Sequence, residues 1–558
     1  MIPISPQYLT LAKLLDGRLF RIPEYQRAYS WTKEQRQDLF GDIEGVRAKG
    51  KDDGHFMAAV VGLRRDKQNL GADEFHVVEV VDGQQRLTTL IILLNTIKIA
   101  LDVSDKSEAK LARELSELLV KDEGEELLLL QTNHDSSYHF ATYLRKGESK
   151  PSATAKALAD RELLKAIEEC KLFVAKWKEN GASLTDLAAL LKNRLFFLLH
   201  EIEDEKSVYT VFEVLNSRGL PVAWLDRLKS ILMGNAFELG DANRKGVIKD
   251  LHTVWRDIYT VVGLRQSMNT EVLRFAATLR AETTPSRPLS EKDSVDTLRD
   301  MSKTGKQIRE ISNWLYRVTL ACDIVETNNR LNAVTRISQA RLLATAIHLR
   351  EDIDSKQKKA LLSRWEKVTF RIYGMLGYDA RKRVGEYVRL AWRIVNENLT
   401  VREIDKGIAE IGEDLTISDA IAKLRGFNCY EGWESELRYF MFRYEEHLAK
   451  KQKLNFRNEQ WEKIWMVSPS DSIEHIWAKS KAPKKSKHRL GNLILLPPNL
   501  NKKLQDGAPK DKVDDYRKTG LLIAIEVADV IDRQGWKASS IEERENELLK
   551  WAAIEWAD

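Results

Sequence analysis

The chain has few cysteines and no long hydrophobic run. Its three cysteines, Cys170, Cys322 and Cys429, lie far apart and form no CxxC pair, which argues against a structural zinc site and against a disulfide framework. No apolar run approaches the roughly 18 residues that a membrane-spanning helix needs. The first residues lack both the basic segment and the apolar segment of a secretory signal. We therefore expect a cytoplasmic protein that makes no contact with a membrane.

An excess of charge of one sign is also missing. Lys+Arg number 89 and Asp+Glu number 84 in the 558 residues, so the net charge is only +5. With 43% hydrophobic and 31% charged residues, the composition is typical of a folded globular protein and not of a disordered one. Because the overall charge is nearly balanced, any binding of nucleic acid must come from local basic patches.

One such patch lies near the carboxyl end, after an acidic residue and a histidine. Residues 472–505 read SIEHIWAKSKAPKKSKHRLGNLILLPPNLNKKLQ. The imidazole of His475 suits proton transfer from water near neutral pH, and carboxylate or amide oxygens suit Mg²⁺. Six cationic side chains with no acid among them suit a phosphate backbone. These six candidate DNA-binding residues are Lys479, Lys481, Lys484, Lys485, Lys487 and Arg489.

The acid–His pair, the basic linker, GNL and a later Asn together resemble an HNH (His-Me finger, ββα-metal) nuclease. That resemblance implies two short strands and a helix around one metal ion. It implies that His475 is the general base, that Glu474 and Asn501 bind Mg²⁺ or Mn²⁺, and that Asn492 holds the loop bearing His475. The family more often has Asp where Glu474 stands. The role of His475 requires an imidazole that is not buried. The alternative is a chance occurrence of E-H and GN.

A strand, a tight turn and a helix are predicted in the amino-terminal third. Residues 55–63 and 75–81 have the composition of strands, and the second runs into DGQQR and a helix with apolar residues at helical spacing. We expect Asp82 to cap this helix, whose free N–H groups would favour a phosphate beside Arg86. The GxxxxGK[ST] motif of a P-loop is absent. The alternative is a capped core helix with a structural arginine.

The other segments of the amino-terminal third indicate structure or function less specifically. Residues 7–16 have the pattern of a short amphipathic helix, and residues 193–202 that of a buried strand. Gln26 and Arg27 stand among aromatic residues, either to grip a phosphate or as part of a surface loop. Further along, Asn216 and Arg218 stand at the end of a predicted helix, beside a glycine. Asp226 and Lys229 follow one helical turn apart, and these two are also consistent with a simple surface pair.

Three signatures occur in the order IPEYQRAYSW, VVDGQQRLTTL and VFEVLNSRGLPVAWLDRLK. Together they resemble the amino-terminal, ParB/sulfiredoxin-like domain of GmrSD-type, modification-dependent (type IV) restriction enzymes, whose chains typically end in an HNH-type domain. The resemblance implies an amino-terminal domain that binds and hydrolyses a nucleoside triphosphate and senses modified DNA. It implies a nucleotide site formed by Gln26, Arg27, Asp82, Gly83, Gln84, Gln85, Arg86, Asn216, Arg218, Asp226 and Lys229.

We therefore predict a predominantly helical α+β protein in three parts. These are a ParB/sulfiredoxin-like domain over residues 1–235, a helical connector over 236–429 and an HNH nuclease domain over 430–558. The predicted function is a nucleotide-regulated endonuclease of prokaryotic antiphage defence that cuts modified, double-stranded phage DNA. Two alternatives are a non-catalytic, nucleotide-gated DNA-binding regulator and an RNA-directed nuclease toxin. The modification, the triphosphate and homo-oligomer formation stay open.

Overall fold

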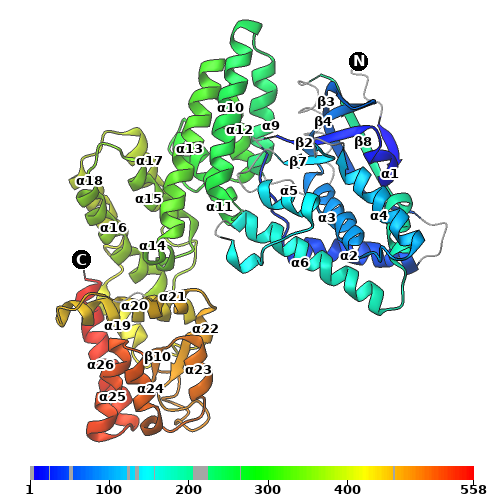
Figure 1. Cartoon of the computed structure of the whole chain (residues 1–558). Helices are drawn as coiled ribbons and strands as arrows, with labels where there is room; N and C mark the ends of the chain where they lie inside the picture. The colour runs from blue at the N-terminus through cyan, green and yellow to red at the C-terminus, as the bar shows by residue number, and fades with distance from the viewer. Residues whose placement is uncertain are drawn as a thin grey trace. The chain divides into compact units, whose positions relative to one another are not determined.

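The computed structural model describes residues 6–23, 26–48, 54–121, 126–131, 137–155, 158–204, 224–263, 265–456 and 459–557. The chain divides into two compact units (Figure 1). The first contains residues 1–273 and 290–320, and the second contains residues 274–289 and 321–558. The predicted α+β, mostly helical class is confirmed. The three predicted domain boundaries stay a prediction.

The first unit is built on a mixed six-stranded sheet in the order β1-β8-β3-β4-β2-β7. Its strands are β1 (Gln7–Thr10), β2 (Arg18–Ile22), β3 (His55–Leu70), β4 (Asp73–Asp82), β7 (Leu129–Gln131) and β8 (Leu195–Ile202). β3 and β4 form an antiparallel hairpin, whereas β2 runs parallel to β4 and β8 runs parallel to β3. The strands predicted near residues 55, 75 and 193 are therefore confirmed. A separate antiparallel pair consists of β5 (Val120–Lys121) and β6 (Glu126–Leu127).

Helix α3 (Gln84–Ala100) lies in the core of this unit. Its residues from Leu87 to Ile97 are buried on all sides of the helix, as expected for a helix surrounded by other elements. It contacts α4, α5, α6 and α7. The helices of this unit are α1 (Leu11–Leu15), α2 (Lys33–Ala48), α4 (Lys106–Leu119), α5 (Ser137–Lys146), η1 (Ser152–Thr154), α6 (Leu158–Glu179), α7 (Leu184–Arg194), α9 (Trp224–Phe237), α10 (Asp241–Val262) and α12 (Glu291–Asp300). Two helices have residues in both units, α11 (Gln266–Arg280) and α13 (Gly305–Thr327).

The helix predicted over residues 7–16 is only half right. Residues 7–10 form β1, which pairs antiparallel with β8, and the helix begins after Thr10, whose hydroxyl accepts a hydrogen bond from the Lys13 amide. Sheet pairing over a long sequence separation therefore outweighs the local helical periodicity.

The second unit is almost entirely helical. Its helices before the basic segment are α14 (Asn329–Val334), α15 (Ser338–Leu349), α16 (Ser355–Thr369), η2 (Phe370–Met375), α17 (Val384–Asn396), α18 (Val401–Ile411), α19 (Ile417–Leu424), α20 (Glu434–Lys451), α21 (Glu459–Trp465) and α22 (Pro469–Ser472). Two short strands follow, β9 (Ile473–His475) and β10 (Leu493–Leu495), with η3 (Leu490–Asn492) between them. The remaining helices are α23 (Pro498–Leu504), η4 (Pro509–Lys512), α24 (Val513–Lys518), α25 (Leu522–Gln534) and α26 (Ala538–Glu555).

The cysteines and the apolar helices can be compared with what the composition led us to expect. All three cysteines are buried and none forms a disulfide. Within the described part of the chain, no helix is both long and apolar enough to cross a membrane.

Candidate functional site

The basic segment belongs to a strand, strand, helix arrangement in the second unit. β9 and β10 pair antiparallel, with Leu493 opposite His475, and α23 follows β10 directly. His475 is thus the last residue of β9, where the chain leaves the strand for the lysine-rich loop. Since successive side chains of a strand face opposite sides, Glu474 and His475 point away from each other.

Glu474 is buried against a lysine. Its carboxylate Oε1 lies 2.6 Å from Nζ of Lys512 and accepts a hydrogen bond from the Tyr516 hydroxyl at 3.1 Å. The same ammonium donates to the backbone oxygen of His475 at 2.9 Å. Burial raises the pKa of Glu474, and Lys512 acts in the opposite direction. Because a buried cation already balances this carboxylate, Glu474 does not fit the expected role of a metal ligand.

His475 is buried, contrary to the sequence-based expectation, with 8% of its surface exposed. Its Nε2 lies 3.1 Å from Nδ1 of His488. The ring of Tyr430 meets the His475 ring edge-on at 4.6 Å and stacks on His488 at 5.0 Å, and Lys479 lies 4.7 Å from the centre of the Tyr430 ring. Burial, followed by the neighbouring His488 and Lys479, lowers the pKa of His475 to about 3, so its imidazole is neutral at pH 7.

Sequence reasoning missed four residues of this site: Tyr430, His488, Lys512 and Tyr516. His488 stands inside the basic run, where only the cationic side chains drew attention. His488 lies 13 positions after His475, and the loop between β9 and β10 brings the two rings together. Tyr430 and Lys512 come from separate segments, so no local spacing marks them.

Two asparagines secure the loop between the strands. Asn492 is fully buried; its Oδ1 accepts from the Trp477 amide at 2.9 Å, and its Nδ2 donates to the backbone oxygens of Trp477 and Lys487, each at 3.0 Å. Asn501 on α23 donates through Nδ2 to the backbone oxygens of Asp471 and Ile473, at 2.9 and 3.1 Å. The first asparagine thus joins the two ends of the loop, and the second ties α23 to the start of β9.

A metal ion held by Glu474 and Asn501 does not fit these contacts. Over the residues that the structure describes, no group of three or more His, Cys, Asp or Glu could hold a metal ion. Glu474 is paired with Lys512, and the Nδ2 atom of Asn501 is bound to backbone oxygens. These bonds engage Oε1 of Glu474 and Nδ2 of Asn501, and they leave one oxygen of each side chain, Oε2 and Oδ1, outside them.

The six basic side chains do not behave alike. Lys479, Lys481, Lys484 and Lys485 are exposed, and Lys487 is half-buried. Arg489 instead forms ion pairs with Glu542 at 2.9 Å and Glu545 at 2.5 Å. Its guanidinium joins the loop to α26, so Arg489 does not fit the predicted role in DNA binding.

In the first unit, the DGQQR turn begins α3, but Asp82 is not the cap. Gly83 takes that position with a positive φ of +90° and forms no side-chain cap. A Cβ at Gly83 would lie 3.1 Å from the backbone oxygen of Ala59, so both the conformation and the space favour glycine. Burial raises the pKa of Asp82, and the nearby Arg27 and Arg86 lower it.

The glutamines of the predicted nucleotide site fasten the preceding loop to α3. Gln85 accepts from the Ser30 amide at 2.8 Å and donates to the Ala28 oxygen at 3.2 Å. Gln84 donates to the Arg27 oxygen at 3.3 Å, and Gln26 donates to the Val81 oxygen at 3.1 Å. Their side chains thus position the loop against the helix start.

Charged residues from three segments gather beside this helix start. Arg86 lies with its Cζ 5.5 Å from the centre of the Trp31 ring, and its buried Nε has no hydrogen-bond partner. Arg27 lies 3.8 Å from Asp226, whose other oxygen accepts from the Tyr259 hydroxyl at 2.5 Å.

Lys229 follows Asp226 on α9 and is buried, which lowers its pKa to about 8. Asp226 thus pairs with Arg27 and lies near Asp82 of the DGQQR turn, and Lys229 lies near Asp226 and Arg27. The nucleotide site that these residues are predicted to form stays a prediction. Asn216 and Arg218 lie outside the described residues.

The chain was compared with known proteins and families. No curated protein matches it. The family model of the GmrSD restriction endonuclease, N-terminal domain, matches residues 11–233, and that of the GmrSD restriction endonucleases, C-terminal domain, matches residues 415–551. The first match contains the DGQQR turn and the second contains His475, Asn492 and Asn501. The two domain models of this family match the chain in order and together cover more than half of its residues. The chain therefore belongs to the GmrSD restriction endonuclease family.

Proposed function

We propose that this restriction endonuclease cleaves modified phage DNA at the His475 site under the control of a nucleoside triphosphate bound at the DGQQR turn. Family membership supports DNA cleavage. The observation that carries the site is the contact between His475 and His488 at the end of β9, directly before a loop of exposed lysines.

In the tautomer that we propose, His475 is the donor in its contact with His488, and this choice decides which of its nitrogens acts as base. When Nε2–H of His475 donates to Nδ1 of His488, the Nδ1 of His475 carries no proton and can accept one from water. His488 then acts as a positioning residue, because it selects the tautomer and orientation of the base. The neutral state of His475 suits this role.

DNA binding would raise the basicity of His475 and uncover it. Lys479 and Lys487 are among the cations that lower its pKa, and phosphates bound to them would offset that effect. Lys479 also lies on the Tyr430 ring that covers His475. A phosphate that draws Lys479 away therefore loosens this cover, and we propose that the unbound enzyme is the closed form.

The triphosphate site is proposed at the start of α3. The free N–H groups of the helix and the cations Arg27, Arg86 and Lys229 suit a polyanion. Arg86 supports this most directly, since its buried Nε lacks a partner. Asp226 pairs with Arg27, and Asp82 lies close enough to Arg27 and Arg86 for their charges to lower its pKa.

The decisive experiment measures cleavage and nucleotide hydrolysis in the same preparations. Matched DNAs that are unmodified, glucosylated or phosphorothioated are incubated with and without each triphosphate, in Mg²⁺, Mn²⁺ or EDTA, beside an RNA of the same sequence. We expect His475→Ala to abolish cleavage and keep hydrolysis, and Arg86→Ala to abolish hydrolysis. Equal loss of both activities in His475→Ala would contradict the division of labour, and preferential RNA cutting would reject DNA as substrate.

A further inference from the structure

A tyrosine of α10 contacts the charged residues beside the DGQQR turn. Tyr259 is buried, with 9% of its surface exposed, and its hydroxyl donates to Oδ1 of Asp226 at 2.5 Å. The Nζ of Lys229 lies 5.2 Å from the centre of the Tyr259 ring. Tyr259 lies beyond residues 11–233, which the family model of the N-terminal domain matches. It therefore belongs to a part of the chain that neither the sequence signatures nor this match include.

The hydrogen bond from Tyr259 restrains the carboxylate of Asp226. Oδ1 faces the tyrosine, whereas Oδ2 lies 3.8 Å from Nη1 of Arg27, beyond the roughly 3.2 Å of an ordinary N–H···O hydrogen bond. Because the two contacts use different oxygens, the bond to Tyr259 fixes the direction of Oδ2. Burial and the charge of Asp226 raise the pKa of Tyr259 well above its ordinary value, so the hydroxyl keeps its proton and stays a donor.

Asp226 acts on two of the three cations that are proposed to hold the triphosphate. It pairs with Arg27, and it raises the pKa of Lys229 against the larger effect of burial. A carboxylate that turned fully onto Arg27 would compete with a phosphate for the same guanidinium, because both anions form charge-assisted hydrogen bonds with it. The orientation of Asp226 therefore affects how strongly this site binds an anion.

We propose that Tyr259 is a positioning residue of the triphosphate site: it holds Asp226 so that the carboxylate does not close onto Arg27. In this role the tyrosine does not touch the triphosphate and acts through Asp226. The inference rests on the proposed function, because it assigns a role within the triphosphate site. It extends that site to α10, outside the matched domain.

Calorimetric titration of the full chain with ATP, GTP, CTP and UTP tests this role. Tyr259→Phe keeps the ring beside Lys229 and removes the hydroxyl, so we expect the triphosphate to bind about fivefold or more weakly. Adding Asp226→Asn should restore the affinity, because a neutral carboxamide does not compete with phosphate for Arg27. A loss caused only by disturbed packing would persist in the double variant.

Tyr143→Phe is the matched control. Tyr143 is a buried tyrosine of the same unit whose hydroxyl lies 2.8 Å from that of Thr96, and the Nζ of Lys171 lies 5.3 Å from the centre of its ring. Thr96 follows Arg86 by ten residues on α3, roughly 15 Å by the helical rise. This control removes a buried hydroxyl away from the DGQQR turn, and we expect binding within about twofold of the unsubstituted chain.

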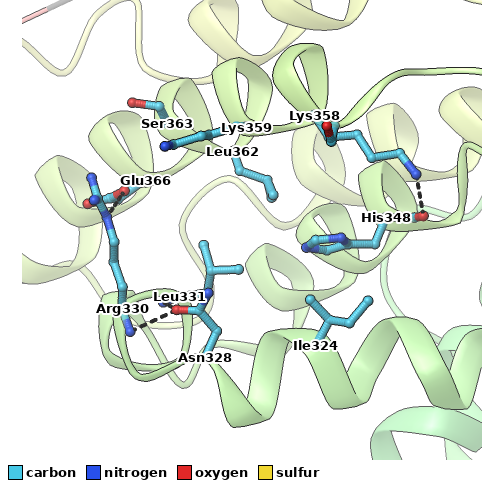
Figure 2. A pocket seen from close by; sticks show the side chains of 11 residues that line it. Ile324, Asn328, Arg330, Leu331, His348, Lys358, Lys359, Leu362, Ser363 and Glu366 are labelled. Atoms are coloured by element: carbon cyan, nitrogen blue, oxygen red, sulfur yellow. Dashed lines mark hydrogen bonds and ion pairs between the residues drawn. The ribbon is translucent and has the colours of Figure 1, made fainter.

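A second control checks where the triphosphate binds. A cavity of about 410 Å³ in the second unit is lined from α13, α14, α15 and α16 and includes Lys359 (Figure 2). Figure 2 shows its other cations engaged at different ends: Arg330 pairs with Glu366 at 3.0 Å, and Lys358 donates to the backbone oxygen of His348 at 3.1 Å. Since these charges do not converge, we expect Lys359→Glu to leave triphosphate binding unchanged.

The outcomes separate the role of Tyr259 from the proposed function. Unchanged binding in Tyr259→Phe, with folding verified by thermal unfolding, would overturn the role of Tyr259 and leave the triphosphate site standing. A loss that Asp226→Asn does not restore would also overturn it, because the hydroxyl would then act by another route. Loss of binding in Lys359→Glu would place the ligand in the second unit. If no triphosphate binds the unsubstituted chain, the proposed triphosphate site is wrong, and the role of Tyr259 with it.

Discussion

At the scale of single residues, the contact between His475 and His488 has a direct kinetic consequence. His488→Ala removes the proposed acceptor for Nε2 of His475, so we expect kcat for DNA cleavage to fall by about 10- to 100-fold with little change in KM. His488→Asn keeps an acceptor oxygen near the former Nδ1 and should restore part of kcat. The measurement is a kcat and KM series for both variants. A rise in KM with unchanged kcat would show that His488 serves DNA binding instead.

The buried ion pair between Glu474 and Lys512 contributes to the stability of the fold. Lys512→Met leaves an unpaired carboxylate in the interior, and we expect the free energy of unfolding to fall by about 3–5 kcal/mol. The double variant Glu474→Gln/Lys512→Met should regain most of this loss, because the carboxamide is neutral and Tyr516 can still donate to its oxygen. Urea unfolding of the single and double variants measures the difference. A double variant no more stable than Lys512→Met would show that the pair is not the cause.

His348 makes stability depend on pH. Its pKa is about 4 in the folded chain, below the ordinary value of about 6.5, so the unfolded chain binds more protons between these values. The contribution of His348 to stability is therefore complete above pH 6.5 and is lost as the pH falls toward 4, by up to about 3 kcal/mol. We expect His348→Phe to flatten the loss of stability in this window, measured by urea unfolding at pH 4.5, 5.5 and 7.5. An unchanged slope would contradict this source.

At the scale of elements, the packing of η3 against α26 explains the glycine of the GNL motif. A Cβ at Gly491 would lie 1.9 Å from the backbone oxygen of Ile541, so α26 would have to move away. We expect Gly491→Ala to destabilise the second unit by several kcal/mol and to impair cleavage through Asn492, its neighbour.

Gly45→Ala on α2 is the control, since its Cβ would meet nothing within 4 Å and alanine favours a helix by up to about 1 kcal/mol. Thermal unfolding of the two variants checks the contrast. If Gly491→Ala unfolds at the same temperature as the unsubstituted chain, the close packing of η3 on α26 is not maintained in solution.

At the scale of the whole molecule, a net charge of only +5 leaves DNA binding to local patches. The exposed Lys484 and Lys485 are part of the proposed patch. Replacing both by Gln should weaken DNA binding regardless of sequence and reduce the slope of log K against log salt by about 2. Fluorescence anisotropy over a range of KCl concentrations measures this slope. The control is Lys292→Gln/Lys306→Gln, two exposed lysines on α12 and α13; an equal change there would reject the patch.

The elements that were predicted correctly have strong local signals. The hairpin of β3 and β4 and the helix after DGQQR follow from alternation, turn residues and helical spacing. The helix predicted over residues 7–16 was half wrong because β8, nearly 190 positions away, pairs with its first residues. Asp82 was predicted as a cap from its residue type, whereas the left-handed conformation at the turn gave that place to Gly83.

The amino-acid sequence by itself determined the family, the mostly helical α+β class and the positions of His475, Asn492, Asn501 and the DGQQR turn. Each of these is indicated by a short motif or by a local periodicity of the sequence. Only the tertiary structure decided what surrounds them: Lys512 on Glu474, His488 and Tyr430 on His475, and Glu545 on Arg489. The physical reason is that charge pairing and burial join segments that lie far apart along the chain, and no local pattern encodes which distant side chain arrives.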